Sequence, residues 1–377
     1  MRYYDLKTTE GLRLFDKPSR YLPMKKELLE LLKDDKTLSS LTFAKKVMFT
    51  HEIKSNNNVE GYSDDVEYIK KVIGKAGEIK NDEKRKRVLN LYRGYKYILE
   101  HKDINPESLK ELYAILSEGL IDPSLIPTMG DYYREGPVYI LKRGRLDDSC
   151  YTGVPYEEIE KYMEMYFRFL EDEKPDDIVD KYIKTQVLHY YFVYIHPYFD
   201  VNGRTSRTLS MWQILNEEIY PFIIFNRGIV LRGSEYDKVI EDVRKYRDLT
   251  YFINYMLDTV ITELEKEYVM QVMADRANSR LEAVDYQTLI YFLTIKGGRS
   301  FLDFVALYNR FNDKKKVSEI FKTMIEPLLD KGVLEIERET HKRIGEENNV
   351  MLKLKHSEDI SRDKVKRLII RWLYWKK

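Results

Sequence analysis

The sequence of 377 residues contains a single cysteine, Cys150, so no disulfide bond can form within the chain. It has no apolar run of 18 residues, which argues against a membrane-spanning helix. Charge of one sign is not in excess either, since the formal net charge is +1. This near-neutral balance argues against a chain that binds polyanions over its whole surface. Its start lacks an apolar signal segment. These absences predict a cytoplasmic protein without membrane contact.

The sequence does contain enough apolar material for a large folded core. Hydrophobic residues make up 43% and charged residues 34%, and helical spacing of the apolar positions dominates. We therefore expect a mainly α protein. Its length predicts two or three packed units: N-terminal helices over residues 1–80, a helical core domain over 81–282 and a separate C-terminal domain over 283–377.

The most informative stretch of the chain begins at His196. Residues 181–195 before it are apolar or aromatic almost throughout, as in a buried helix. Pro197 has no backbone donor and disfavours helical geometry in the preceding residue, so this helix is predicted to end at His196. An imidazole on such a turn can serve as a general base.

A second helix is predicted to open at Asn202 and Gly203 and to end at Tyr220 and Pro221. Its first turn offers free backbone N–H groups and the positive end of the helix dipole, which suit phosphate oxygens. Arg204 and Arg207 lie three residues apart, so both guanidinium groups reach this end. Asp200 adds a hard oxygen ligand suited to a Mg²⁺ ion that bridges phosphates. The stretch as a whole predicts a nucleotide-transfer site.

Each of these residues also has an ordinary structural interpretation. A lone histidine is more often structural than catalytic, two arginines three residues apart usually form a solvated helix face, and an aspartate before a helix is often a cap. The combination in one short stretch, at a helix N-terminus, is harder to explain as structure alone.

The same stretch resembles the signature of Fic-domain proteins, His-x-Phe-x-(Asp/Glu)-Gly-Asn-Gly-Arg-x-x-Arg. The positions that match in register are His196, Asp200, Asn202, Gly203, Arg204 and Arg207. Two positions depart from the signature. Tyr198 replaces the phenylalanine, and its ring can still anchor the loop in the core. Val201 replaces the first glycine, and a β-branched residue is strained there if the loop requires a positive φ.

The resemblance implies the Fic fold, a mainly helical bundle with a short β-hairpin flap, over about residues 40–265. It also implies a protein adenylyltransferase, an enzyme that moves AMP from ATP to a Ser, Thr or Tyr hydroxyl of a target protein. The implied roles are general base for His196, binding of the α- and β-phosphates for Asn202, Gly203 and Arg204, pairing with the γ-phosphate for Arg207, and part of a Mg²⁺ site for Asp200.

Residues 55–61 lie upstream and are largely polar. Taken alone, they form a polar helix that ends at Gly61. Many Fic proteins carry (Ser/Thr)-x-x-x-Glu-(Gly/Asn) on an upstream helix, whose glutamate pairs with the second signature arginine. Glu60 and Gly61 match this motif, and Asn56 stands in place of the hydroxyl residue. The resemblance implies autoinhibition, because a carboxylate bonded to Arg207 takes the place and the charge that the γ-phosphate would use.

Glycines, a proline and alternating β-formers replace helical spacing over residues 129–141, which favours a short hairpin. A hairpin on a helical protein is often only a connector. The resemblance implies instead a flap that docks the target segment by strand addition. The edge strand of that flap is predicted to comprise Val138, Tyr139, Ile140 and Leu141. Tyr132 or Tyr133 is a candidate for self-modification.

The chain from about Val284 is predicted to form a winged-helix-like domain, an appendage of some Fic proteins. Its expected elements are helices over residues 288–295, 301–311 and 317–329 and a hairpin formed by 333–339 and 350–355. Lys314, Lys315 and Lys316 precede the last helix and could contact DNA phosphates. Acidic residues along that helix weaken the nucleic-acid interpretation, so a role in protein binding or homodimerisation stays open. The basic and aromatic tail is expected to pack as a final helix.

Two other functions also stay open. The chain could remove AMP, or transfer another nucleotide or a phosphate. The signature residues identify where the phosphates bind and say less about which nucleobase is bound. It could instead be a DNA-binding regulator with a weakly active Fic domain, in which Val201 marks the loss of catalysis.

Overall fold

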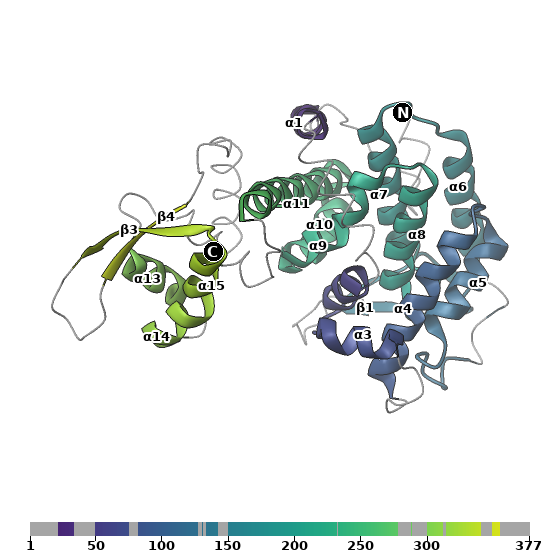
Figure 1. Cartoon of the computed structure of the whole chain (residues 1–377). Helices are drawn as coiled ribbons and strands as arrows, with labels where there is room; N and C mark the ends of the chain where they lie inside the picture. The colour runs from purple at the N-terminus through teal and green to yellow at the C-terminus, as the bar shows by residue number, and fades with distance from the viewer. Residues whose placement is uncertain are drawn as a thin grey trace. The chain divides into compact units, whose positions relative to one another are not determined.

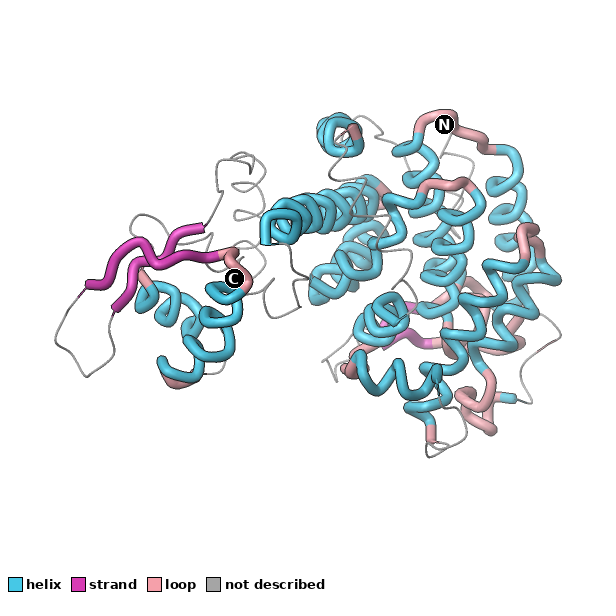
Figure 2. The backbone as a smooth tube through the Cα atoms, in the orientation of Figure 1, coloured by secondary structure: helices cyan, strands magenta, loops and turns pink. Residues whose placement is uncertain are grey.

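The computed structural model describes residues 22–33, 50–74, 82–126, 130, 133–141, 150–231, 233–277, 288, 300–311, 314–340 and 349–354. The chain divides into two compact units, residues 1–32 with 41–263 and residues 33–40 with 264–377. Helices dominate both units, and the strands form two small hairpins (Figures 1 and 2). The mainly α fold with a short hairpin is confirmed, whereas the three domain ranges predicted from the sequence stay predictions.

The first unit is built on two neighbouring helices, α7 (Ile178–Ile195) and α8 (Asn202–Asn216), which lie side by side (Figure 1). Asp177 caps α7, since its carboxylate accepts bonds from the N–H groups of Val179 at 2.9 Å and Asp180 at 3.0 Å. Every residue from Tyr182 to Ile195 is buried. The prediction of a buried helix before His196 is therefore confirmed.

The remaining helices of this unit pack around that pair. They are α1 (Leu22–Leu32), the helical residues 50–59, α3 (Val66–Gly74), α4 (Glu83–Glu100), α5 (Pro106–Ser117), α6 (Ile159–Asp172), α9 (Phe225–Leu231), α10 (Gly233–Tyr246) and the start of α11 (Thr250–Ala277). Short 3-10 helices cover Tyr156–Glu158 and Tyr220–Ile224. Helices α1 and α6 contact α7, whereas α4 and α5 contact α8. Gly94 lets α4 and α5 approach, because a Cβ there would lie 2.8 Å from Leu116 Cδ2.

The end of α8 differs from the sequence-based prediction. The helix ends at Asn216, before the predicted stop at Tyr220 and Pro221, and the left-handed Glu218 (φ 55°) follows. The proline instead opens a 3-10 helix, where its missing N–H group is not needed. Residues 229–231 are helical and belong to α9.

The hairpin of the first unit consists of β1 (Tyr139–Leu141) and β2 (Cys150–Thr152), which pair antiparallel with Ile140 opposite Tyr151. The strands lie later in the chain than the start of the predicted stretch, so residues 133–138 lead into the hairpin as a loop. Pro137 accounts for this shift, because a residue without an N–H group does not fit inside a ladder.

The second unit contains α13 (Phe301–Phe311) and a helical stretch from Val317 to Asp330. This stretch comprises α14 (Val317–Ile320), a π-helical turn (Phe321–Ile325) and α15 (Glu326–Asp330). The π-helical turn lies just before Pro327, whose missing N–H group breaks the regular α-helical ladder. Strands β3 (Leu334–Thr340) and β4 (Asn349–Leu354) form the predicted antiparallel hairpin.

The winged-helix assignment of this unit stays a prediction. The helix expected over residues 288–295 lies outside the described residues except for Thr288, and so does the tail over 364–377. Lys314 and Lys316 are exposed, while Lys315, which precedes α14, pairs with Glu319 of that helix at 3.3 Å. DNA binding and dimerisation by this unit receive no support. None of the described helices is long and apolar enough to cross a membrane.

Candidate functional site

His196 lies directly after α7 in the left-handed region, with φ 53° and ψ 61°. Its N–H group still donates to the carbonyl of Phe192 at 2.9 Å, and its own carbonyl accepts a bond from Arg134 Nε at 2.8 Å. Nδ1 of the ring lies 3.4 Å from the Val193 carbonyl, which favours the tautomer with the proton on Nδ1. The lone pair of Nε2 is then available to accept a proton. The predicted helix break at His196 is confirmed.

The half-buried His196 ring is neutral at pH 7. Burial is the main cause that lowers the pKa of His196 to about 4. The charges of Arg134 and Arg244 act in the same direction, and the bond to Val193 opposes them. A neutral imidazole is the form that a general base requires.

The loop between α7 and α8 is closed by Asn202. Its side-chain amide donates to the carbonyl of Tyr198 at 2.7 Å and accepts from the N–H of the same residue at 3.0 Å. The Tyr198 ring is buried and stacks on Tyr113, with 3.5 Å between the ring centroids and 8° between the planes. Tyr198 thus anchors the loop, as expected from the sequence. Contact between Asn202 and a phosphate stays a prediction.

Asp200 presents an exposed carboxylate at the lip of this loop. Its Oδ1 accepts a bond from the N–H of Val201 at 2.6 Å. Within the described ranges no group of three or more His, Cys, Asp or Glu side chains could hold a metal ion by itself. Mg²⁺ is commonly held by one or two carboxylates together with phosphates and water. A single exposed aspartate beside a phosphate seat fits that pattern.

Val201 precedes α8 with φ 65° and ψ 7°, in the left-handed region where a β-branched residue is strained. This is the position at which the sequence raised a steric conflict. The Val201 side chain is 3% exposed, so its methyl groups also contribute to the core. At Val201 the left-handed backbone therefore lowers the stability of the fold, while burial of the side chain raises it.

This opposition predicts a reversed order of stability for two substitutions. Val201→Ala and Val201→Gly both remove the buried methyl groups, but only glycine relieves the left-handed strain. We expect the glycine variant to be more stable than the alanine variant by about 1 kcal/mol, as measured by urea unfolding. At an ordinary helical position glycine is the less stable of the two. An alanine variant of equal or greater stability would contradict the strain.

The first turn of α8 brings Arg204 and Arg207 together inside the molecule. Arg204 is 6% exposed and Arg207 1% exposed. Arg204 Nη1 has no hydrogen-bond partner within the described part of the chain. Burial lowers the pKa of Arg204, while the charges of Glu60 and Asp200 raise it. Buried cations without full compensation at a helix N-terminus favour an anionic ligand.

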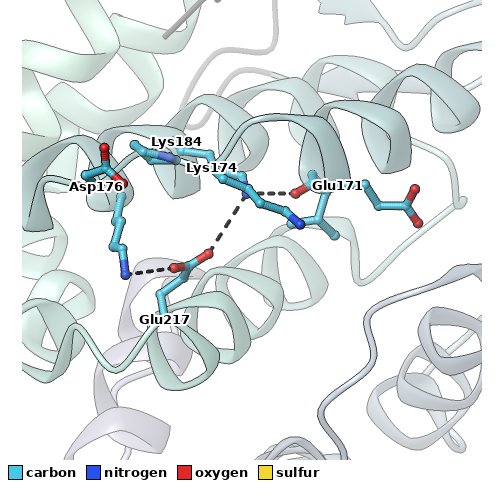
Figure 3. Close-up of a pocket in the computed structure, with 8 residues that line it drawn as sticks. Glu171, Lys174, Asp176, Lys184 and Glu217 are labelled. Atoms are coloured by element: carbon cyan, nitrogen blue, oxygen red, sulfur yellow. Dashed lines mark hydrogen bonds and ion pairs between the residues drawn. The ribbon is translucent and has the colours of Figure 1, made fainter.

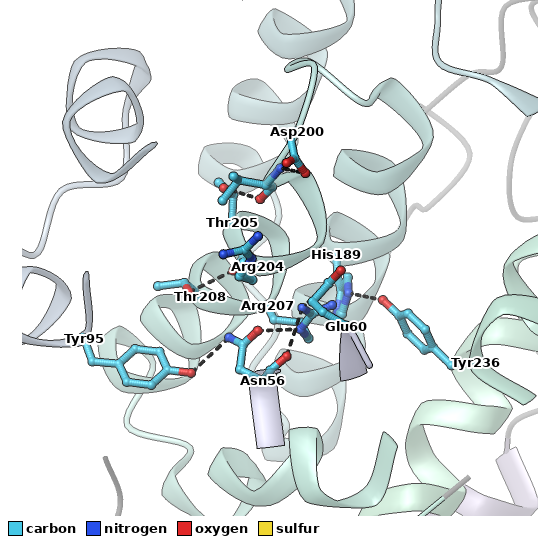
Figure 4. Close-up of polar contacts among 11 residues, drawn as sticks. Asn56, Glu60, Tyr95, His189, Asp200, Arg204, Thr205, Arg207, Thr208 and Tyr236 are labelled. Atoms are coloured by element: carbon cyan, nitrogen blue, oxygen red, sulfur yellow. Dashed lines mark hydrogen bonds and ion pairs between the residues drawn. The ribbon is translucent and has the colours of Figure 1, made fainter. Parts of the chain in front are cut away.

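Glu60 forms an ion pair with Arg207, in which Nη2 donates to Oε1 of the carboxylate (Figure 4). Burial, the largest single influence, lowers the pKa of Arg207, but the charge and hydrogen bond of Glu60, together with Tyr236 and Tyr95, raise the pKa above its usual value. The same Oε1 lies over Gly203, where any Cβ would overlap it. The Glu60 carboxylate thus occupies the start of α8, beside Gly203, Arg204 and Arg207. We call this position the anion seat.

Asn56 secures this ion pair from the helix of residues 50–59. Its Oδ1 accepts a bond from Arg207 Nε at 2.9 Å, and its backbone carbonyl accepts one from Nη2 at 3.3 Å. Its Nδ2 donates to the hydroxyl of Tyr95 at 3.1 Å on α4 (Figure 4). Asn56 therefore links Arg207 and the core residue Tyr95 to the helix that leads into Glu60.

His189, on α7, is a second buried histidine near Arg207 (Figure 4). Its Nε2 lies 2.7 Å from the Tyr236 hydroxyl, and its Nδ1 lies 3.2 Å from Gln186 Oε1. Burial, together with the charge of Arg207, lowers the pKa of His189 to about 3. Both ring nitrogens have protein partners, so we interpret this histidine as structural.

The structure brings most of the predicted site together. Asp200, Asn202, Gly203, Arg204 and Arg207 follow one another from the loop into α8, and His196 precedes them. Glu60 joins them from the turn after the helix of residues 50–59. Sequence reasoning missed Arg134, Tyr95 and the bonding role of Asn56. No periodic or motif signal identifies Arg134, because its bond to the His196 carbonyl spans 62 residues.

Of the four residues predicted for the edge strand, Tyr139, Ile140 and Leu141 form β1, whereas Val138 lies in the loop before it. Tyr139 is 64% exposed, Val138 and Ile140 are half-buried, and the side chain of Leu141 lies outside the described part. Tyr133, a candidate for self-modification, has its ring centroid 6.0 Å from that of Tyr198. Tyr132 lies outside the described residues. Self-modification and target docking stay predictions.

A depression of about 550 Å³ lies elsewhere, where the end of α6 and the start of α7 meet the end of α8 (Figure 3). Lys184 within it is buried, and its ammonium group donates to the Leu170 carbonyl at 2.7 Å. Glu217 pairs with Lys181 at 3.2 Å and lies 4.0 Å from Lys184. Lys181 and Lys184 share the Glu217 carboxylate, and Glu171 and Asp176 also line the depression, so we do not interpret it as a second anion-binding site.

Comparison with known proteins identifies similar chains. Residues 103–214 match the protein-family model described as Fic/DOC family. A Fic family protein from Desulfovibrio desulfuricans G20 matches with a TM-score of 0.56 at 17% identity, over 91% of this chain and 98% of that one. Fic-1 from C. elegans matches with a TM-score of 0.48 at 16% identity, over 70% of this chain and 76% of that one. A Fic domain containing signaling protein from Bacteroides thetaiotaomicron matches with a TM-score of 0.43 at 16% identity, over 70% of this chain and all of that one.

Proposed function

Because residues 103–214 form a Fic/DOC domain, we propose that this chain is a protein adenylyltransferase, which moves AMP from ATP to a Ser, Thr or Tyr hydroxyl of a target protein. The observation that carries the proposal is a neutral imidazole at His196 beside a helix N-terminus with two buried arginines. This arrangement combines a proton acceptor with an anion seat, as phosphoryl-type transfer requires.

The reaction that these residues would support is a single in-line displacement. The oxygen of the target hydroxyl attacks the α-phosphorus of ATP while its proton passes to His196 Nε2. A bond from the hydroxyl oxygen to the α-phosphorus forms, and the bond from that phosphorus to the pyrophosphate oxygen breaks. The products are AMP-modified protein and pyrophosphate, and the proton on the imidazole returns to solvent. Positioning and charge stabilisation supply most of the rate enhancement.

The triphosphate would lie along the start of α8. The N–H groups of that turn and Arg204 would hold the α- and β-phosphates, with Arg204 Nη1 as the group that still needs an acceptor. Asp200 would hold Mg²⁺ together with phosphate oxygens, and the ion would supply neutralisation of the triphosphate charge. Arg207 would take the γ-phosphate.

We further propose that the enzyme is autoinhibited by Glu60. The support is the ion pair with the buried Arg207 and the position of the carboxylate over Gly203, at the N-terminus of α8. Two anions cannot share one guanidinium and one helix end without repulsion. The γ-phosphate and Glu60 therefore compete for the same seat.

The lowered pKa of His196 predicts that transfer tolerates acid. A base with an ordinary histidine pKa loses activity as the pH falls below about 6.5. His196 instead stays neutral down to a pKa of about 4, so this step should weaken only as the pH approaches that value. Proton NMR of the histidines over pH 3–8, with the His196→Ala spectrum to identify the resonance, gives the midpoint directly. A midpoint at or above pH 6 contradicts the buried neutral base.

A labelling experiment tests the proposed function. Purified Glu60→Gly protein is incubated with Mg²⁺ and each of the α-labelled triphosphates of A, G, C and U, alone and with cell lysate. The proposal expects label on protein hydroxyls from ATP above all, located by mass spectrometry. Stronger label from another triphosphate would replace AMP with that nucleotide. Label from γ-labelled ATP, tested in parallel, without label from α-labelled ATP would indicate phosphate transfer. No label from any α-labelled triphosphate would refute nucleotidyl transfer.

A further inference from the structure

A pocket of about 520 Å³ lies between the hairpin, α7 and the end of α10, outside the anion seat described above. Val138 and Thr152 bring the hairpin to its rim, and Tyr190 and Tyr194 of α7 form part of its wall. Arg244 of α10 and Arg247, just after α10, also line the pocket. Neither the proton transfer nor the triphosphate seat makes use of this pocket.

The pocket shares a wall with the catalytic histidine. Gly153 lines the pocket, and a Cβ on it would lie 2.9 Å from His196 Cβ and 2.9 Å from the Ile195 carbonyl. Arg134 also lines the pocket and holds the His196 carbonyl through Nε at 2.8 Å. A side chain placed in the pocket therefore belongs to a segment that passes close to His196.

The charge of the pocket is positive. Arg134, Arg244 and Arg247 line it, with Glu157 as the acidic residue of the lining. Arg134 is 2% exposed and donates to carbonyls at Gly136 and Val154 as well as at His196, so neutral groups take its hydrogen bonds. Burial lowers the pKa of Arg134 to about 10, which reflects the cost of holding this charge away from water.

Arg244 is held in place at the mouth of the pocket. It donates to the carbonyls of Thr152 at 3.1 Å and Tyr194 at 3.3 Å, and its guanidinium lies 4.9 Å from the Tyr194 ring centroid. Arg247 lies one turn further along, just after α10, and is exposed. No carboxylate in the described ranges lies within ion-pair distance of Arg247. The pocket thus offers one cation that is held in place, Arg244, and one exposed cation, Arg247, three positions apart in the sequence.

The chemistry of the lining favours a short carboxylate side chain on a peptide. Tyr156, Tyr190 and Tyr194 supply apolar surface for the methylene groups, and the arginines supply donors for the carboxylate. A strand added to the hairpin would present alternate side chains to one face at intervals of about 7 Å. Such a strand can place a hydroxyl at His196 and a neighbouring side chain in the pocket.

We propose that this pocket is a specificity pocket, which takes an Asp or Glu side chain of the target segment whose hydroxyl receives AMP. The inference rests on the proposed function and adds the substrate class, an acidic segment of the target. Arg247 and Arg244 discriminate for acidic and against basic side chains near the modified hydroxyl.

Synthetic decapeptides test this inference. Each carries one central Thr, Ser or Tyr, and Ala, Glu or Lys is scanned through the flanking positions. The enzymes are the Glu60→Gly protein and four variants of it, each with one further substitution: Arg247→Glu, Arg247→Gln, Arg244→Gln, or the control Arg168→Glu. Arg168 is exposed on α6 and outside the pocket, so its reversal changes the net charge equally. Readouts are AMP transfer to peptide by mass spectrometry and peptide binding by fluorescence anisotropy.

We expect Glu at one flanking position to raise kcat/KM about tenfold over Ala, as one charge-assisted contact does. Arg247→Gln and Arg244→Gln should each reduce this preference, Arg247→Glu should turn it toward Lys, and Arg168→Glu should retain it. Transfer without an acidic preference, or a preference unchanged in Arg247→Glu, overturns the pocket and leaves the proposed function standing. If no peptide is modified, peptide affinity measured by anisotropy tests the pocket. A tenfold affinity preference for Glu over Ala that is lost in Arg247→Glu supports the pocket, and the absence of such a preference overturns the proposal.

Discussion

Replacement of His196 by alanine in the Glu60→Gly protein is expected to reduce AMP transfer by about 100- to 10,000-fold, the usual contribution of a positioned general base. No other described side chain offers the same combination of a neutral ring nitrogen and a place beside the anion seat. His189 cannot substitute, because both its nitrogens have protein partners and its pKa is lowered to about 3.

The measurement is the rate of label transfer from α-labelled ATP at saturating nucleotide, with ATP affinity measured separately. Loss of a base lowers the rate and leaves ATP binding intact, whereas a misfolded loop lowers both. His101→Ala is the matched control, since His101 is exposed at the end of α4 and bonds through its ring to the Tyr97 carbonyl. Transfer by His196→Ala at the rate of the parent protein would remove the histidine from the mechanism.

Removal of the Glu60 carboxylate is expected to raise AMP transfer by about 5- to 150-fold, the range of a coupling energy between two competing sites. In the native chain the carboxylate satisfies Arg207 and fills the start of α8. Glu60→Gly leaves a buried guanidinium that keeps its bonds to Asn56 and has lost its counter-charge. A γ-phosphate can then replace the lost anion at the same atoms.

Two variants grade this effect. Glu60→Gln keeps the size of the side chain but removes its charge, so an intermediate rate is expected. Glu100→Gly is the matched control, because Glu100 is exposed at the last residue of α4, where glycine is well tolerated. ATP should also raise the melting temperature of Glu60→Gly more than that of the native chain, because only the variant has an open seat. Equal rates and equal ATP-dependent shifts in both proteins would refute inhibition by Glu60.

Features that depend on residues close together in the sequence were predicted more accurately than features that depend on distant segments. The break at His196 depends on Pro197 and on the apolar run before it, and both are local, so it was predicted correctly. The strain at Val201 was anticipated because steric limits on φ belong to the residue itself. The end of α8 was misplaced by four residues, since helix ends depend on backbone geometry at Glu218 that no residue type dictates.

Other parts of the site depend on contacts between distant segments. The Glu60–Arg207 pair spans 147 residues, and composition alone favours a polar helix end at this position. A resemblance between motifs indicated that pair, and the packing of residues 50–59 against α8 gives it its geometry. No sequence motif indicated the bond between Arg134 and the His196 carbonyl.

The sequence by itself determined the helical class, the break at His196 and the order of the groups from Asp200 to Arg207 that we propose bind an anion, because these follow from local backbone preferences and from residue chemistry within one short stretch. The tertiary structure alone decided which carboxylate faces Arg207, that Arg134 holds the His196 carbonyl, and that Arg244 and Arg247 share a pocket with residues of the hairpin. The physical reason is that burial, pKa and ion pairing arise from side chains that only long-range packing brings together.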